Sequence, residues 1–86
     1  MDPEQALREI RRYAIANQIR YSGHALLRMA QRRISRQDVR AGLVSATRCI
    51  PEPGGRWHTM GGLDLDGVEL EVVVVFEDGL FVISTF

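Results

Sequence analysis

Three side chains suited to phosphate chemistry recur at intervals of four residues: His24, Arg28 and Arg32. On a helix they form one stripe, because four residues exceed a full turn by only about 40°. Histidine can transfer a proton near pH 7, and arginines can hold a phosphate and stabilise the charge that develops on its oxygens. This combination indicates metal-free cleavage of RNA, in which the 2′-hydroxyl of the RNA is the nucleophile.

His58 is a second candidate proton carrier, and Arg56 shares its face if the segment is a strand. Two histidines can divide the roles of general acid and general base. The predicted site therefore consists of two catalytic histidines and three phosphate-binding arginines: His24, His58, Arg28, Arg32 and Arg56. Plainer interpretations stay open. The stripe is also typical of a solvated helix face, with His24 as a cap and the arginines in ion pairs, and a single histidine on a strand is often structural.

We expect neither a metal nor a cofactor. The single cysteine, Cys49, and two histidines far apart in the sequence match no metal-ligand spacing. The glycine pairs at 54–55 and 61–62 lack the flanking residues of a phosphate-binding loop. One cysteine also excludes a disulfide within the chain, so folding must depend on core packing.

Composition indicates an ordinary globular domain. The chain has 86 residues, of which 45% are hydrophobic and 26% charged, and this argues against both a disordered segment and a membrane protein. The longest apolar run, Val72–Phe76, is far shorter than the roughly 20 residues of a membrane helix. The first residues do not resemble a signal peptide. We therefore expect a cytoplasmic protein that does not bind membranes.

The net charge of zero conceals two halves of opposite sign. Residues 1–50 hold ten arginines and four acidic residues, whereas residues 51–86 hold one arginine and seven acidic residues. An arginine-rich half suits contacts with phosphate. Exclusive use of arginine over lysine is equally typical of a GC-rich genome, so charge alone identifies no partner.

Three helices are predicted, each behind a residue that can cap its N-terminus. They span about residues 3–16, 23–33 and 36–47. The clearest start is the third, where Ser35 and Asp38 can form a capping box. Residues 18–22 are a short strand or an extended linker, and the prolines and glycines of residues 51–55 predict an irregular loop.

From residue 56 the hydrophobic period becomes two, which predicts an antiparallel meander over residues 56–86. Two-residue turns are expected at Asp66-Gly67 and Asp78-Gly79, and the first would set Asp64 opposite Glu69. One face then forms the core: Trp57, Leu63, Leu70, Val72, Val74, Phe76, Phe81 and Ile83. The second face gathers His58, Met60, Val73, Val75, Val82, Ser84 and Phe86.

The second face is more apolar than a solvated sheet face should be. Either the first helix or a second copy covers it, or it docks a partner. The chain also ends inside a predicted strand, which leaves an edge free for pairing. In either case we expect a homo-oligomer or a hetero-complex.

The fold expected from these elements is one α+β domain, residues 1–86. Two to three N-terminal helices from the helix-rich residues 1–50 pack on one face of a C-terminal antiparallel sheet of three to four strands.

The segment from Tyr21 to Val39 resembles a small uncharacterised bacterial domain family with the signature S-x-H-A-x-x-R-M-x-x-R-x-I-x-x-x-x-V. The resemblance covers about residues 18–86 and leaves the first helix as an addition. Where relatives often have glycine before the isoleucine, this chain has Arg33.

Such domains are similar to the RelE/ParE/BrnT toxins of bacterial toxin–antitoxin systems. The resemblance implies a RelE-like fold, an mRNA endonuclease that acts on the ribosome or on free mRNA, and an antitoxin partner, which in some members is a zinc-ribbon protein. It carries the family histidine onto His24 and the two arginines onto Arg28 and Arg32. The wider toxin group usually keeps its catalytic residues on the sheet and near the C-terminus.

The sequence is therefore consistent with two functions. The first is a toxin that cleaves mRNA without a metal. The alternative is a non-catalytic protein-binding module or a homo-oligomeric interaction domain.

Overall fold

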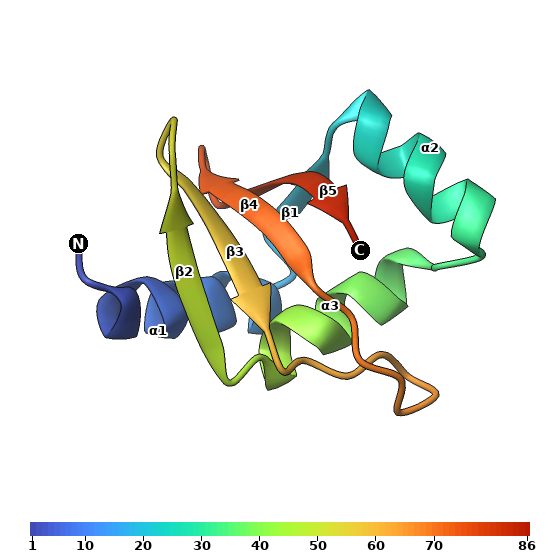
Figure 1. The fold of residues 1–86 in the computed structure, drawn as a ribbon, viewed down its shortest axis with the longest axis horizontal. Coiled ribbons are helices and arrows are strands. Elements are labelled where there is room, and N and C mark those ends of the chain that lie inside the picture. The colour runs from blue at the N-terminus through green and yellow to red at the C-terminus, as the bar shows by residue number, and fades with distance from the viewer.

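The computed structural model describes residues 1–86 as three helices and one five-stranded mixed sheet (Figure 1). The elements are α1 (Pro3–Ile15), β1 (Ile19–Tyr21), α2 (Gly23–Arg32), α3 (Arg36–Ser45), β2 (Arg48–Glu52), β3 (Arg56–Met60), β4 (Val72–Phe76) and β5 (Leu80–Thr85). The strands lie in the order β1-β5-β4-β3-β2, with β1 parallel to β5 and the other pairs antiparallel. The α+β class and the N-terminal helices are confirmed. The predicted count of three to four strands was too low, and the sheet is not purely antiparallel.

The helices begin where their capping residues predict. At α3, the Ser35 hydroxyl accepts a hydrogen bond from the Asp38 backbone N–H, and the Asp38 carboxylate accepts one from the Ser35 N–H. Asp2 and Gln5 form the same reciprocal pair at α1. At the end of α2, Arg33 has a φ of 56°, in the left-handed region. Glycine adopts that conformation at no steric cost, so a glycine would suit this position better than an arginine.

Two strands extend the predicted meander, one on each side. Residues 19–21 form β1, which resolves the choice between strand and linker in favour of the strand. The loop predicted from residue 51 was wrong at its start, because Pro51 lies inside β2. β2 is the outermost strand and pairs only with β3. A proline is tolerated on such an edge, where one side of the backbone needs no partner.

The β4–β5 turn differs from the two-residue prediction. Phe76 pairs with Leu80, so three residues connect the strands. The extra residue reverses the faces of β5: Leu80 and Val82 lie in the core, whereas the predicted core residue Phe81 is only half-buried. Ile83 is also half-buried. A register shift between Val73 and Val74 then sets Ser84 opposite Val73.

The connection between β3 and β4 is likewise longer than a two-residue hairpin. Leu63, rather than Asp64, bridges to Glu69, so the expected clash of two carboxylates does not occur. Instead the Asp64 carboxylate accepts hydrogen bonds from the backbone N–H groups of Asp66 and Val68, at 2.9 Å each. Asp64 thereby holds the Asp66-Gly67 turn from inside the loop.

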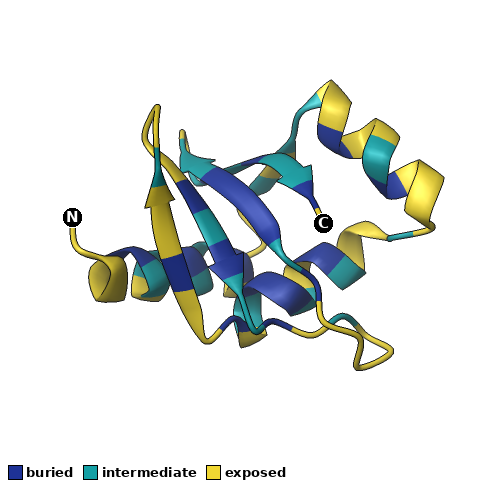
Figure 2. Ribbon diagram, viewed as in Figure 1, coloured by how far each residue is buried: buried dark blue, intermediate teal, exposed yellow.

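All three helices contribute to one core on one face of the sheet. The core joins buried side chains of the helices to those of the strands: Ala6, Ile10, Ala14, Ala25, Met29, Val39, Leu43, Cys49, Trp57, Leu70, Val72, Val74, Leu80 and Val82. Buried residues are concentrated in α1, α3 and the inner strands, whereas α2 is exposed along most of its length (Figure 2). Because α1 packs in this core, the expectation that α1 covers the second sheet face was wrong. No helix of the chain has the length and hydrophobicity to cross a bilayer.

Candidate functional site

The sheet face without helices carries the candidate site, and β3 positions its central residue. Side chains alternate along β3, so Trp57 and Thr59 are buried in the core while His58 points to the other face. The Thr59 hydroxyl donates to the Val72 carbonyl at 3.1 Å and accepts from the Val72 N–H at 3.3 Å. These bonds fix β3 against β4, and they thereby fix the backbone position of His58.

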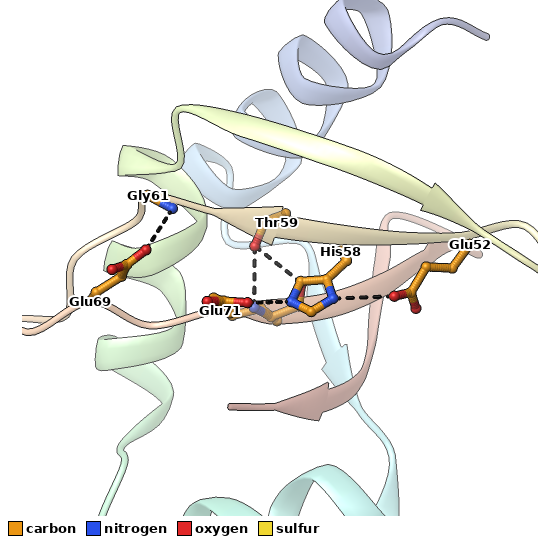
Figure 3. Close-up of polar contacts among 7 residues, drawn as sticks. Glu52, His58, Thr59, Gly61, Glu69 and Glu71 are labelled. Carbon is orange, nitrogen blue, oxygen red and sulfur yellow. Dashed lines mark hydrogen bonds and ion pairs between the residues drawn. The ribbon is translucent and has the colours of Figure 1, made fainter.

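A carboxylate lies beside each ring nitrogen of His58 (Figure 3). Nε2 is 2.6 Å from Glu71 Oε1, and Nδ1 is 3.2 Å from Glu52 Oε2. The His58 side chain is 17% exposed, and those of Glu52 and Glu71 are 38% and 36% exposed. A neutral imidazole can donate to only one of these carboxylates, whereas the doubly protonated ring can donate to both. The arrangement can therefore hold and pass a proton at a partly solvated position.

Phe86, directly after β5, stacks on the imidazole of His58, although β4 lies between β5 and β3 in the sheet. The ring centroids of His58 and Phe86 are 5.4 Å apart and the planes differ by 16°. Phe86 reaches this place because its backbone pairs with that of Glu71: Phe86 N–H donates to the Glu71 carbonyl at 2.9 Å, and the reverse bond is 3.4 Å. One backbone pair thus brings both the carboxylate and the aromatic ring to His58.

Arg56 lies on the same face as His58, two residues earlier on β3, and is exposed. It forms no ion pair. Arg48 of β2 lies opposite Met60 and is also exposed. Unpaired guanidinium groups therefore lie on the same sheet face as the Glu52–His58–Glu71 cluster.

His24, Arg28 and Arg32 form the predicted stripe on α2, but no polar contact joins them to the His58 cluster. His24 and Arg32 are exposed. Arg28 is half-buried, and its Nε is shielded from solvent without a hydrogen-bond partner. α2 packs on β5 through Ala25 and Met29 on the core side of the sheet. The structure thus brings Arg56 and His58 onto one face and keeps the α2 residues on a separate element.

The thiol and hydroxyl side chains on and near the central strands do not join this cluster. The Cys49 thiol is buried with its Sγ 3.3 Å from the Pro3 carbonyl, and burial raises its pKa, so it stays a protonated, weak nucleophile. Thr85 is buried on the core side and its hydroxyl has no partner. Ser84 lies opposite Val73 on the open face, without a base beside it.

Sequence reasoning missed both glutamates. Glu52 approaches His58 only because β2 pairs with β3 across a Pro-Gly-Gly turn, whereas the prolines and glycines of this segment predict a loop. Glu71 lies two residues before Val73, so strand alternation places it on the same face as Val73 and Val75, whose assignment to the second face was correct. The alternation therefore contained the signal for Glu71, whereas Glu52 required recognition of an edge strand that contains a proline.

The comparisons with known proteins identify a family. Residues 21–86 match the family described as "Domain of unknown function (DUF4258)". The chain belongs to the DUF4258 family. The DUF4258 region begins at the end of β1 and excludes α1, which confirms the expectation of a small uncharacterised family preceded by an added helix. The region contains every residue of the His58 cluster as well as the α2 stripe. No curated protein and no solved structure matches the chain.

Proposed function

We propose that this DUF4258 protein is a metal-independent endoribonuclease of the toxin type, with its chemistry centred on His58. The observation that supports this proposal is an imidazole between two carboxylates on a sheet face that no helix covers. His24, the residue favoured by the family signature, has no comparable partner.

RNA cleavage by this route requires one group to remove a proton and another to supply one. The 2′-oxygen attacks the adjacent phosphorus while its proton passes to a base, and the bond from phosphorus to the 5′-oxygen breaks as that oxygen receives a proton from an acid. In our proposal the contact between Glu71 and His58 Nε2 opens around the substrate, so that the Glu71 carboxylate is the base and the freed Nε2–H of the doubly protonated His58 ring is the acid. Glu52 holds the His58 ring from the other side. The products are a 2′,3′-cyclic phosphate and a free 5′-hydroxyl.

The phosphate needs positive charge close to this pair. Arg56 supplies it in our proposal, because it is exposed on the face of His58 and forms no ion pair, although Glu52 lies opposite it in the pairing of β2 with β3. A guanidinium can contact two phosphate oxygens at once and stabilise the charge that develops on them. The α2 stripe then serves to bind more of the RNA or the ribosome rather than to catalyse.

The toxin assignment is supported by the arrangement of the layers. Helices on one face, an uncovered opposite face and polar chemistry on the sheet agree with what the resemblance to RelE-type toxins implies. An antitoxin that covers the open face would be the natural partner of such a protein.

A specific observation favours a second candidate, a protein-binding module. Both ring nitrogens of His58 are already engaged within the chain, and exposed apolar side chains lie beside it: Phe86 is 48% exposed, and Ile50, opposite His58, is 41% exposed. An apolar surface of this kind suits a protein partner. On this alternative the ion pairs are structural.

The decisive experiment is incubation of the purified protein with RNA, with and without ribosomes, in an excess of chelator. We expect cleavage that leaves 2′,3′-cyclic phosphate ends. An Arg8→Gln variant, which removes a charge from an exposed position of α1, should cleave like the unmodified protein. Absence of cleavage under all of these conditions would leave the protein-binding module as the function.

A further inference from the structure

A polar pocket of about 480 Å³ lies on the helix side of the sheet, away from His58. It is formed where the end of α1, the strand β1 and the start of α3 meet. Its lining residues are Asn17, Ile19, Tyr21, Arg36, Gln37 and Arg40. Two of them are arginines and none is acidic, so the lining carries a net positive charge.

Arg40 is held in place by the end of α1. Its Nε donates to the Ala14 carbonyl and its Nη2 to the Ile15 carbonyl, each at 2.9 Å. A guanidinium has five N–H donors, so three remain after these two bonds. The charge is therefore fixed in position and still has donors for a ligand.

Arg36 lies over the ring of Tyr21, with its central guanidinium carbon 5.2 Å from the ring centroid. The Tyr21 hydroxyl makes a long contact of 3.5 Å to the Arg36 carbonyl. Burial raises the pKa of Tyr21, so the phenol is a neutral donor at pH 7. Tyr21 thus orients one guanidinium without neutralising it.

Asp38 lies between Arg36 and Arg40 on α3 but does not neutralise their charge. The Asp38 carboxylate is occupied by the N-cap, through the Ser35 N–H and hydroxyl at 2.9 Å each, and by the Leu65 N–H at 3.1 Å. Neither Arg36 nor Arg40 forms an ion pair. Two guanidinium groups at the edge of one pocket without a counter-ion favour an anionic ligand.

We propose that this pocket binds the phosphate monoester of a small organic molecule. A monoester carries close to two negative charges at pH 7, which match two guanidinium groups, whereas a phosphodiester carries one. The volume falls within the range of about 300–1,000 Å³ typical of small-molecule pockets, which leaves room for an organic group beside the phosphate. Because the pocket and His58 lie on opposite sides of the sheet, this site is independent of the proposed cleavage site.

The test is a titration of the isotope-labelled protein with ribose 5-phosphate, followed by NMR. We expect saturable shifts of the Asn17 and Gln37 amide signals, and about tenfold weaker binding by Arg36→Gln. Arg8→Gln removes an equal charge from α1 outside this pocket and should bind like the unmodified protein. Ribose without phosphate should leave both amides unchanged, and dimethyl phosphate, a diester, should bind more weakly.

Three results would overturn the inference. These are an absence of saturable shifts at millimolar ester, equal affinity in Arg36→Gln and the unmodified protein, and equal binding of dimethyl phosphate. RNA cleavage is measured separately on Arg36→Gln, where we expect no change. Failure of the pocket proposal therefore leaves the His58 proposal intact, and the reverse also holds.

Discussion

Glu71, beside β4, contacts His58 of the neighbouring strand β3, with Glu71 Oε1 2.6 Å from His58 Nε2. Glu71 immediately precedes β4, and its backbone bonds with Phe86 extend the pairing with β5 by one residue. The carboxylate is therefore attached to an ordered backbone rather than to the mobile tip of a loop. A catalytic pair needs such support, because small displacements of reacting groups cost large factors in rate.

The two glutamates should contribute unequally to cleavage. We expect Glu71→Gln to lower the rate by about 100-fold, since general base catalysis supplies about 10²–10⁴-fold. Glu52→Gln should lower it by less, because Glu52 only orients the ring from 3.2 Å. Single-turnover cleavage of one RNA by both variants measures the difference. Equal losses would assign both carboxylates the same supporting role.

Arg33→Gly should stabilise the protein. Arg33 adopts a left-handed conformation at the end of α2, which costs a residue with a β-carbon about 1 kcal/mol relative to glycine. Part of that gain is offset by the greater freedom of glycine in the unfolded chain. We expect a net increase of about 0.5 kcal/mol in the free energy of unfolding, measured in urea. Arg33→Ala retains the β-carbon and is the matched control, so a lower stability of the glycine variant than of the alanine variant would contradict the argument.

Asp38→Asn should lower stability at neutral pH and have less effect in acid. Hydrogen bonds from the Ser35 and Leu65 backbone hold the pKa of Asp38 below its usual value. Its contribution is therefore present above the unfolded pKa, near 3.8, and is lost as the pH falls through the lower folded value. Urea unfolding at pH 7 and pH 3 measures this change. Asp66→Asn, in the exposed turn, is the control: its difference in unfolding free energy from the unmodified protein should not shrink between pH 7 and pH 3.

Gly62→Ala should be strongly destabilising although the residue does not have a positive φ. A β-carbon at this position would lie 1.9 Å from the carbonyl oxygen of Gly42, so the loop after β3 would have to move away from α3. We expect a loss of roughly 3 kcal/mol or more, because overpacking against backbone cannot relax by side-chain rotation. Gly23→Ala has open space around the new atom and should unfold at nearly the same urea concentration as the unmodified protein.

Local chemistry predicted the helices well. Capping residues such as Ser35 define a helix start within one turn of the chain, and no distant contact is needed to read them. The faces of β3 and β4 were also predicted. The longer connection shifts the pairing of β3 with β4 by two residues from the predicted register, and an even shift leaves His58 and Val73 on the same face.

The errors arose where one residue or one distant partner decides the outcome. A three-residue turn in place of two moved Phe81 out of the core and Val82 into it. β2 was missed because Pro51 and the glycines after it resemble a loop, and only pairing with β3 makes the segment a strand. Because β2 was not predicted, Glu52 was not placed beside His58, and the sequence identified the histidine without this carboxylate.

The sharpest comparison is that of His58→Gln with His24→Gln in the same cleavage assay, with folding checked by urea unfolding. We expect His58→Gln to lower the cleavage rate by at least about 100-fold, and His24→Gln to cleave at nearly the rate of the unmodified protein. An inactive His24→Gln beside an active His58→Gln would show instead that the catalytic histidine lies on α2.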